Sequence, residues 1–339
     1  TLKEGDFISL NGTTGEVYKG KVETKAAEVS GDFAALMDLC NKYTKLNVRT
    51  NADTPHDAEV ARAFGASGIG LCRTEHMFFD AEKIVAMREM ILSPDVEGRR
   101  KALAKLLPFQ KADFKGIFKA MDGCPVNVRL LDPPLHEFVP HDAKGQEEMA
   151  KAMGVTVQEI KKRVESLCEH NPMSGHRGCR LGNTYPEITE MQTQAILGAA
   201  IELKKEGYDP HPEIMVPLTG ILYEFEAQEK VIRDAAAALF EKEGMEIPFK
   251  VGTMIEIPRA ALTANRIASR AEYFSFGTND LTQMTFGYSR DDIASFLPVY
   301  LEKKILKVDP FQVLDQNGVG QLIEMAVDKG RSVRPDLKC

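Results

Sequence analysis

The sequence repeats one pattern seven times: a short apolar run that ends on polar residues, then a stretch with helical spacing. The apolar runs lie at residues 45–51, 68–76, 125–138, 173–182, 212–218, 251–258 and 273–280. Alternating strands and helices predict a parallel sheet covered by helices. Seven repeats favour an α/β fold, a (β/α)8 barrel of the TIM type that lacks its eighth strand in this chain. Residues 142–170 predict extra inserted helices, one of which opens with a capping box at Thr156 and Glu159.

The stretch from Val251 to Arg290 carries the clearest chemical signal. Two apolar runs in it end near an acid, Glu256 in the first and Asp280 in the second. The carboxyl ends of parallel strands meet at one edge of a sheet, where α/β proteins place their sites. Two carboxylates there can bind one hard divalent cation, for which we expect Mg²⁺. The alternative interpretation is that both acids only cap the helices that follow.

Arginines follow several of the predicted strands. The arginines at the ends of predicted strands are Arg49, Arg73, Arg129 and Arg177. Arg290 lies beyond the last predicted strand, and the amide of Asn279 lies beside the second acid. Guanidinium groups that converge with two acids predict an anionic ligand that also carries a metal, such as a phosphorylated carboxylate. Each arginine by itself could instead form a surface ion pair, which contributes little.

Three histidines, His76, His136 and His176, lie near the same strand ends. A phosphoryl-transfer enzyme could use one of them to carry the phosphoryl group. None lies in the small-residue setting that marks a phosphoryl-accepting histidine. We therefore interpret them as hydrogen-bonded strand-end residues.

Composition and charge exclude some classes of protein. The 339 residues carry a formal net charge of -7, which predicts no binding to nucleic acid or to an acidic membrane. No apolar run approaches the roughly 20 residues that cross a bilayer, and the first residues do not resemble a signal peptide, so we expect a protein that is not secreted. Six cysteines without metal-binding spacing indicate reduced thiols. Because the sequence starts at Thr1, we expect it to be a piece of a longer protein.

The first 45 residues differ from the rest. Two short apolar runs flank Asn11 and Gly12, a pair typical of a β-hairpin turn, and residues 31–45 have helical spacing. We expect this segment to join a small β element to the main body.

Five blocks of the sequence resemble one known family. GLCRTEHMFF, VRLLDPPLHEF, GHRGCRL, GTMIEIPRAAL and FSFGTNDLTQMTFGYSRDD are similar to the carboxyl-terminal domain of the pyruvate, phosphate dikinases, which binds phosphoenolpyruvate (PEP) and pyruvate. The FGTNDLTQ block is shared with PEP synthase and with enzyme I of the sugar phosphotransferase system, which remain alternatives. A third alternative is a module that dimerises and binds no substrate. The blocks DPPLHEF and RTEHMFF are those that favour the dikinases.

The resemblance implies domains and a reaction. Residues 1–25 would be a remnant of the swivelling phosphohistidine domain, residues 26–44 a linker helix, and residues 45–339 the truncated PEP/pyruvate-binding barrel. The parent enzyme would use ATP, phosphate and pyruvate to make AMP, pyrophosphate and PEP, reversibly. Its partners would be the phosphohistidine and nucleotide-binding domains of the same chain and a second copy in a homodimer. Its compartment would be the cytoplasm or an organelle lumen, such as a plastid or glycosome.

The resemblance also implies site residues. The predicted substrate-binding set is Arg73, Arg129, Glu256, Gly277, Thr278, Asn279, Asp280 and Arg290, and the predicted Mg²⁺ ligands are Glu256 and Asp280. The family's acid/base cysteine is expected just beyond Cys339. We therefore expect this chain alone to bind its ligand without turnover.

Overall fold

The structure, a computed structural model, describes residues 2–12, 14–24, 30–169 and 171–339. The chain divides into two compact units, residues 1–47 and 48–339. The boundary lies close to residue 45, where the barrel is expected to begin. The origin of residues 1–25 in a swivelling domain stays a prediction.

The first unit contains a hairpin and one helix. Strands β1 (Ile8–Asn11) and β2 (Glu16–Lys19) pair antiparallel, with Asn11 opposite Glu16, so the predicted hairpin is confirmed. Helix α1 (Gly31–Tyr43) forms within the helical stretch predicted from residue 31. The first part of the predicted linker helix, up to residue 29, lies outside the described residues.

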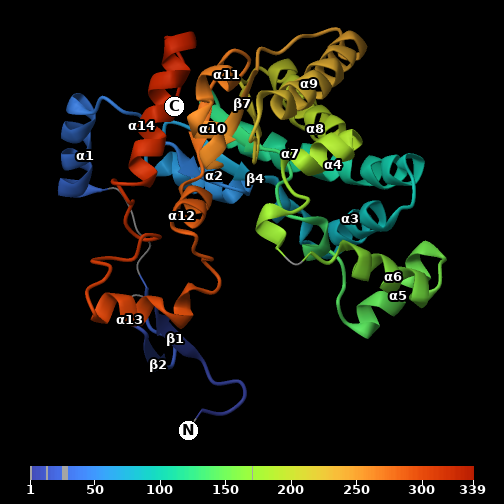
Figure 1. The fold of residues 1–339 in the computed structure, drawn as a ribbon, viewed down its shortest axis with the longest axis horizontal. Helices are drawn as coiled ribbons and strands as arrows, with labels where there is room; N and C mark the ends of the chain where they lie inside the picture. Colours follow the sequence, from blue (N-terminus) through green and yellow to red (C-terminus); the bar gives the residue numbers. More distant parts are fainter. Residues whose placement is uncertain (1, 13, 25–29, 170) are drawn as a thin grey trace. The chain divides into compact units, whose positions relative to one another are not determined.

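The second unit is built on one parallel sheet of six strands, and Figure 1 shows its strands with helices around them. Their order is the order of the chain: β3 (Thr50–Asn51), β4 (Ile69–Arg73), β5 (Pro125–Arg129), β6 (His211–Val216), β7 (Lys250–Ile255) and β8 (Phe274–Phe276). Consecutive parallel pairing of this kind is the topology of a TIM-type barrel. Because β3 and β8 are the two edges of the described sheet, the barrel is partial, as predicted.

The predicted fourth strand, residues 173–182, is wrong. This segment forms the 3-10 helix η3 (Pro172–Ser174) and the short helix α7 (Cys179–Thr184), and β5 pairs directly with β6. Its glycines explain the difference. Gly178 has φ of 58°, in the left-handed region that a strand cannot contain, and the chain turns there.

The last residues of the chain lie beside the edge strand β8. Lys338 forms an isolated parallel bridge with Tyr273, and the backbone N–H of Phe274 donates to the carbonyl oxygen of Lys338 at 2.8 Å. Leu337 is buried at the same edge. The residues after α14 thus begin to pair where the next strand of a barrel would lie.

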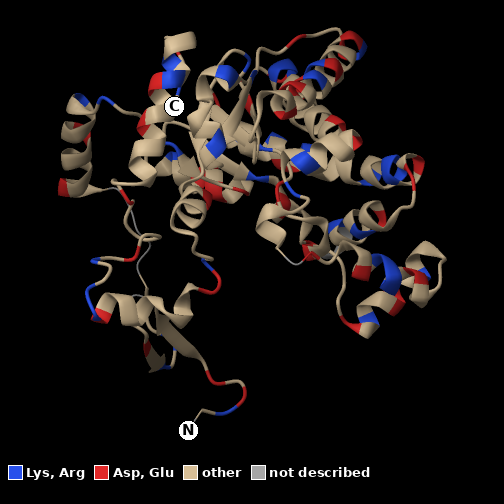
Figure 2. Cartoon of the chain, in the orientation of Figure 1, with Lys and Arg blue, Asp and Glu red and all other residues tan. Residues whose placement is uncertain are grey.

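Helices connect and cover the strands. The longer ones are α2 (Pro55–Ala63), α3 (Ala81–Leu92), α4 (Val96–Ala120), α5 (Ala143–Met153), α6 (Val157–Leu167), α8 (Pro186–Lys205), α9 (Leu222–Glu243), α12 (Thr278–Phe286) and α14 (Val319–Val333). The short ones are α10 (Pro258–Leu262), α11 (Ala264–Ala268), α13 (Leu297–Glu302), η1 (Thr74–Phe78), η2 (Leu135–Glu137) and η4 (Ile293–Ser295). Helix α8 packs between α4 and α9 (Figure 1). Charges of both signs occur along the helices (Figure 2).

Some helix boundaries differ from the pattern in the sequence. A proline usually ends or kinks a helix, but Pro108 lies inside α4 without ending it, and the helical stretch is divided between α3 and α4. Asp95 fixes that break because its side chain accepts from the backbone N–H of Gly98 at 2.8 Å and caps α4. The predicted capping box of Thr156 and Glu159 is present at the start of α6. None of the helices among the described residues combines the length and the hydrophobicity that crossing a bilayer requires.

A buried polar contact inside the partial barrel holds the sheet together. The hydroxyl of Tyr273 donates to Oδ1 of Asn127 at 2.8 Å, and the amide nitrogen of Asn127 donates to the carbonyl oxygen of Gly70 at 3.0 Å. Gly252 makes room for this arrangement, because a Cβ there would lie 2.5 Å from the Tyr273 ring. Strands β4 and β5 and the start of β8 are thereby connected through side chains as well as through their ladders.

Tyr273→Phe tests this contact. The substitution leaves the buried oxygen of Asn127 without a donor, so we expect the free energy of unfolding to fall by about 1–3 kcal/mol in urea titrations. Tyr223→Phe is the control, because that side chain is 68% exposed and its loss of a hydroxyl should change stability little. Equal stabilities of the two variants would contradict the role given to Asn127.

Candidate functional site

The carboxyl edge of the sheet collects most of the residues predicted to bind a ligand. Arg73 and Arg129 are the last residues of β4 and β5 and lie opposite one another in that ladder. Glu256 directly follows β7, and Gly277 follows β8. Residues 278–280 form the first turn of α12. The strand ends therefore meet at one edge, as the pattern in the sequence predicts.

Arg129 is held between two carboxylates. Its Nη2 donates to Oε1 of Glu75, and its Nη1 lies 3.0 Å from Oδ2 of Asp132. The residue as a whole is only 9% exposed. Burial disfavours its charged form, but Asp132 and Glu75 outweigh that effect and raise the pKa of Arg129 above its usual value. Nε of Arg129 and Oε2 of Glu75 are buried and have no hydrogen-bond partner among the described residues, an arrangement that is uncommon for buried polar atoms.

Asp132 also binds a second arginine. Nη2 of Arg177 lies 2.6 Å from Oδ2 of Asp132, and the same nitrogen lies 3.4 Å from Oδ2 of Asp280. Arg177 comes from the segment before α7, not from a strand end. Gly178 permits this approach: a Cβ there would lie 3.1 Å from Oδ1 of Asp132 and 2.6 Å from Cβ of Leu218. Asp132 therefore connects the end of β5 to the start of α7 and, through Arg177, to α12.

Glu256 is buried at the same edge, with only 2% of its surface exposed. Its Oε1 accepts from the backbone N–H of Leu218 at 2.6 Å. Leu218 has φ of 61°, an uncommon value for a leucine, so the chain is turned to aim this N–H at the carboxylate. Gly277 lies against the other side, where a Cβ would come within 2.6 Å of Oε2 of Glu256.

The charge state of Glu256 depends on its neighbours. Burial raises the pKa of this carboxyl well above its usual range, and the negative charges of Asp132 and Asp280 raise it further. Arg129 and the Leu218 N–H act in the opposite direction but do not outweigh them. The site thus disfavours a further negative charge in the absence of a cation.

The ion pairs and the electrostatic effects on Glu256 define a charged cluster. It contains the carboxylates of Glu75, Asp132, Glu256 and Asp280 and the guanidinium groups of Arg129 and Arg177. With all four acids ionised, four carboxylates against two guanidinium groups leave two negative charges, which is the charge of one divalent cation.

The described residues do not contain a group of three or more His, Cys, Asp or Glu side chains placed to hold a metal. Mg²⁺ does not need one, because it often binds one or two carboxylates and completes its octahedron with water and substrate oxygens. The carboxylate oxygens of Glu256 and Asp280 are donors of the type that this ion prefers.

Five predicted residues lie outside the charged cluster: Gly277 and Arg73, and also Thr278, Asn279 and Arg290. Thr278 and Asn279 are exposed at the start of α12. Arg290 is exposed too; its backbone N–H donates to Oε1 of Gln283 at 2.9 Å, and its guanidinium carbon lies 6.0 Å from the centre of the Phe311 ring. Its side chain faces that ring.

Arg73 is bound to a residue absent from the predicted set. Its backbone N–H donates to Oδ1 of Asp53 at 2.7 Å, and its Nη1 lies 3.7 Å from Oδ2 of the same carboxylate. Asp53 follows β3 by two residues. Because β3 is only Thr50–Asn51 and its register with β4 shifts, spacing in the sequence does not locate Asp53.

Arg49 is not a strand-end residue, contrary to the prediction. It precedes β3 and pairs with Glu213 near the start of β6, with its Nη1 2.6 Å from Oε2. It therefore belongs to the opposite edge of the sheet. Glu75 and Asp132 are also missing from the predicted set; both follow a strand-end arginine by two or three residues, and that spacing is the signal that could have found them.

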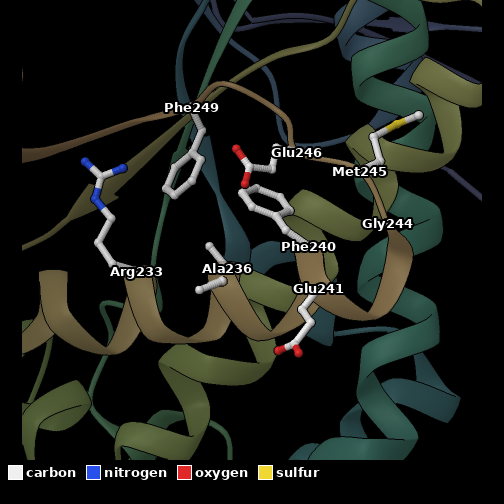
Figure 3. A pocket seen from close by; sticks show the side chains of 9 residues that line it. Arg233, Ala236, Phe240, Glu241, Gly244, Met245, Glu246 and Phe249 are labelled. Carbon is white, nitrogen blue, oxygen red and sulfur yellow. The ribbon is translucent and has the colours of Figure 1, made fainter.

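A cavity of about 780 Å³ adjoins the charged cluster. Asp132 and Arg177 line it together with His136, Met284 and Tyr288. A second cavity, of about 480 Å³, lies between α9 and the segment that leads to β7. Figure 3 shows Arg233 and Phe240 on α9 and Phe249 on the segment that leads to β7, and none of the charged cluster lines this cavity. Of these two cavities, only the first is lined by residues of the charged cluster.

Comparisons with known proteins identify relatives of this chain. The family described as PEP-utilising enzyme, PEP-binding domain, matches residues 27–335. The chain is 58% identical to a pyruvate, phosphate dikinase of Clostridium symbiosum and 58% identical to one of Giardia intestinalis. It is 56% identical to the chloroplastic pyruvate, phosphate dikinase 1 of Arabidopsis thaliana.

These alignments cover 100%, 99% and 100% of this chain. They cover only 39%, 38% and 35% of the three relatives, so the chain spans less than half the length of the curated proteins it matches. The match to the family, in contrast, takes in nearly the whole partial barrel and every residue of the charged cluster. This chain belongs to the family of PEP-utilising enzymes, as their PEP-binding domain.

Proposed function

We propose that this chain is the part of a pyruvate, phosphate dikinase that binds PEP and pyruvate. The observation that carries the proposal is the charged cluster, which lies at the carboxyl edge of the sheet and adjoins a cavity. The relatives named above favour a dikinase over PEP synthase or enzyme I. The sequence blocks that favour the dikinases also supply two members of the cluster: RTEHMFF contains Glu75 and DPPLHEF contains Asp132.

The proposed reaction of the parent enzyme transfers a phosphoryl group between a phosphohistidine and pyruvate. In the direction of PEP synthesis, a base removes a proton from the methyl carbon of pyruvate. The enolate oxygen then forms a bond to phosphorus as the N–P bond of the phosphohistidine breaks. Negative charge develops on the enolate and phosphoryl oxygens, and fixed cations facing them lower the barrier. By the resemblance to the dikinases, we propose that the base is the family's acid/base cysteine.

The roles of the site residues follow from their charge and place. Arg73 and Arg129 bind the phosphoryl and enolate oxygens, and Arg177 adds a third guanidinium beside them. The buried, unpartnered Nε of Arg129 supports a polar partner at this place that the chain itself does not supply. The remaining predicted contacts come from the segment that follows β8: Gly277, Thr278, Asn279 and Arg290.

Mg²⁺ is the cofactor we propose, held by Glu256 and Asp280. The uncompensated charge of the cluster and the raised pKa of Glu256 support this assignment, because both favour a cation at this place. When bound, the ion would neutralise negative charge on the phosphoryl and enolate oxygens. Glu256 would be aimed by Leu218 and kept in place by Gly277.

The parent chain would supply further partners. We propose that a phosphohistidine domain and a nucleotide-binding domain of the same chain deliver the phosphoryl group, and that the enzyme forms a homodimer. The greater length of the relatives supports the additional domains. The compartment would be the cytoplasm or an organelle such as a plastid, since one relative is described as chloroplastic.

Calorimetric titration of the chain with PEP tests the proposal. We expect heat of binding in the presence of MgCl₂ and much less in its absence, because the ion and the arginines bind the same anion. The oligomeric state is measured by light scattering in parallel. A dimer that shows no heat with PEP and MgCl₂ would contradict the proposal and favour a dimerisation module.

Glu256→Gln distinguishes loss of metal binding from loss of the folded structure. Glutamine keeps an oxygen that can accept from Leu218 but loses the negative charge, so Mg²⁺-dependent PEP affinity should fall at least about tenfold, or about 1.4 kcal/mol. Glu241→Gln is the matched control, since Glu241 is exposed and lines the other cavity (Figure 3). Unchanged affinity in Glu256→Gln would remove this residue from the metal site.

The raised pKa of Glu256 predicts how stability depends on pH without metal. Between the ordinary carboxyl pKa and the raised one, the folded chain binds a proton that the unfolded chain does not, so the free energy of unfolding falls as pH rises. The contribution is at most about 1.4 kcal/mol per pH unit. Thermal unfolding from about pH 5 to about pH 9 should show a smaller decline for Glu256→Gln than for the unsubstituted chain or Glu241→Gln. Identical slopes would mean that Glu256 is ionised in the folded chain.

A further inference from the structure

A second, smaller group of polar residues lies at the ends of β3 and β4. It consists of Asp53, Arg73 and His76. Oδ1 of Asp53 accepts from the backbone N–H of Arg73 at 2.7 Å, and Oδ2 lies 2.8 Å from Nδ1 of His76. The side chain of Asp53 is 15% exposed, and that of His76 is 52% exposed. Both oxygens of this carboxylate therefore have a hydrogen-bond donor that is not the Arg73 guanidinium.

The Arg73 guanidinium is close to Asp53 without being bound tightly. Its Nη1 lies 3.7 Å from Oδ2, which is within an ion pair but too long for a hydrogen bond. Among the described residues, its side chain makes no hydrogen bond, and 32% of it is exposed. Arg129, in contrast, is bound by two carboxylates. Arg73 is thus the strand-end arginine whose donors are left unused.

We propose that His76 is a positioning residue that keeps Arg73 available to the anionic ligand. By donating to Oδ2 of Asp53, His76 takes one of the two acceptor positions of the oxygen nearest the guanidinium and reduces its attraction for Arg73, which stays 3.7 Å away. This inference rests on the proposed function, in which Arg73 binds oxygens of PEP. His76 does not itself contact the ligand.

The hydrogen bond fixes the state of the His76 ring. A carboxylate can only accept, so Nδ1 must carry the hydrogen, in the neutral ring as well as in the charged one. His76 also follows Arg73 by only three residues, in the 3-10 helix η1 that begins directly after β4. The short helix returns the chain toward the strand end, so that the ring and the guanidinium reach the same carboxylate.

Without His76, the Asp53 carboxylate loses one hydrogen-bond donor, and Arg73 no longer competes with His76 for Oδ2. A hydrogen bond between the charged guanidinium of Arg73 and a carboxylate is stronger than one between neutral groups. The guanidinium can form it through one N–H group or through two in parallel. The gap of 3.7 Å needs only a small movement of the guanidinium to close. A ligand phosphate would then have to displace Asp53 before it could bind Arg73.

Four variants test the inference: His76→Ala, His76→Asn, Asp53→Asn and the double variant His76→Ala with Asp53→Asn. PEP affinity is measured by calorimetry in the presence of MgCl₂. We expect His76→Ala to weaken it about fivefold, the order of one partly exposed ion pair. His76→Asn should restore it, because the amide nitrogen of asparagine takes the place of Nδ1.

The Asp53 variants separate positioning from simple loss of structure. Asparagine keeps an oxygen for the Arg73 N–H but loses the charge that attracts the guanidinium, so Asp53→Asn should bind PEP at least as well as the unsubstituted chain. His76→Ala should then have no effect in the Asp53→Asn background. If Asp53→Asn weakens binding as His76→Ala does, the three residues only support the fold and the inference is wrong.

A measurement without ligand keeps the inference testable on its own. In chain labelled at arginine, NMR reports rotation of the Arg73 guanidinium about its Nε–Cζ bond, with Arg73→Lys identifying its signals. We expect slower rotation in His76→Ala than in the unsubstituted chain and normal rotation in His76→Asn. Absence of PEP binding by the unsubstituted chain would contradict the proposed function but not the role of His76. Equal rotation rates in all variants would overturn the role of His76.

Discussion

The carboxylate of Asp132 is the contact on which the geometry of the candidate site depends. It is almost fully buried and binds both Arg129, at the end of β5, and Arg177, before α7. Two guanidinium groups this close repel one another unless an anion lies between them. Removing one member of a buried ionic network leaves the others uncompensated, which costs more than the pair itself contributes. Asp132 therefore sets where both cations point before any ligand binds.

The rest of the cluster has an excess of negative charge, and this excess has a structural origin. Glu256 is buried among carboxylates because Leu218 adopts a left-handed backbone conformation and Gly277 carries no side chain. Such a position is unfavourable for an ionised acid by itself, as its raised pKa indicates. Residues held at a cost to stability occur where function requires them. A cation between Glu256 and Asp280 would remove the cost.

Much of the architecture is readable from the sequence because parallel strands place their last residues at one edge. That rule alone locates Arg73, Arg129, Glu256 and Asp280, and the Asn11–Gly12 pair locates the hairpin. The rule fails where the backbone is not a strand. In residues 173–182, glycines allow a left-handed turn, so Arg177 reaches the site from a loop that the pattern predicts as a strand.

Spacing in the sequence also does not predict contacts between separate helices and strands, for a different reason. Arg49 resembles a strand-end arginine, but β3 begins only after it, and its side chain pairs with Glu213 near the other edge. Asp53 lies past a strand of two residues whose register shifts, so no periodicity reports where its side chain points. These positions depend on which strand lies next to which, information that a single sequence does not contain.

The three arginines of the site differ in how firmly they are held, and the difference suits the chemistry proposed. Arg129 and Arg177 are each fixed by two carboxylates, so they present charge that does not need to reorganise as the reaction proceeds. Arg73 has one loose ion pair and a partly exposed side chain, so in the proposed reaction it can follow a phosphoryl group that moves between donor and acceptor. A site with only fixed cations would favour one position of that group, whereas a reversible transfer has to accommodate two. The pairing of Asp53 with His76 is what leaves this third cation free to move.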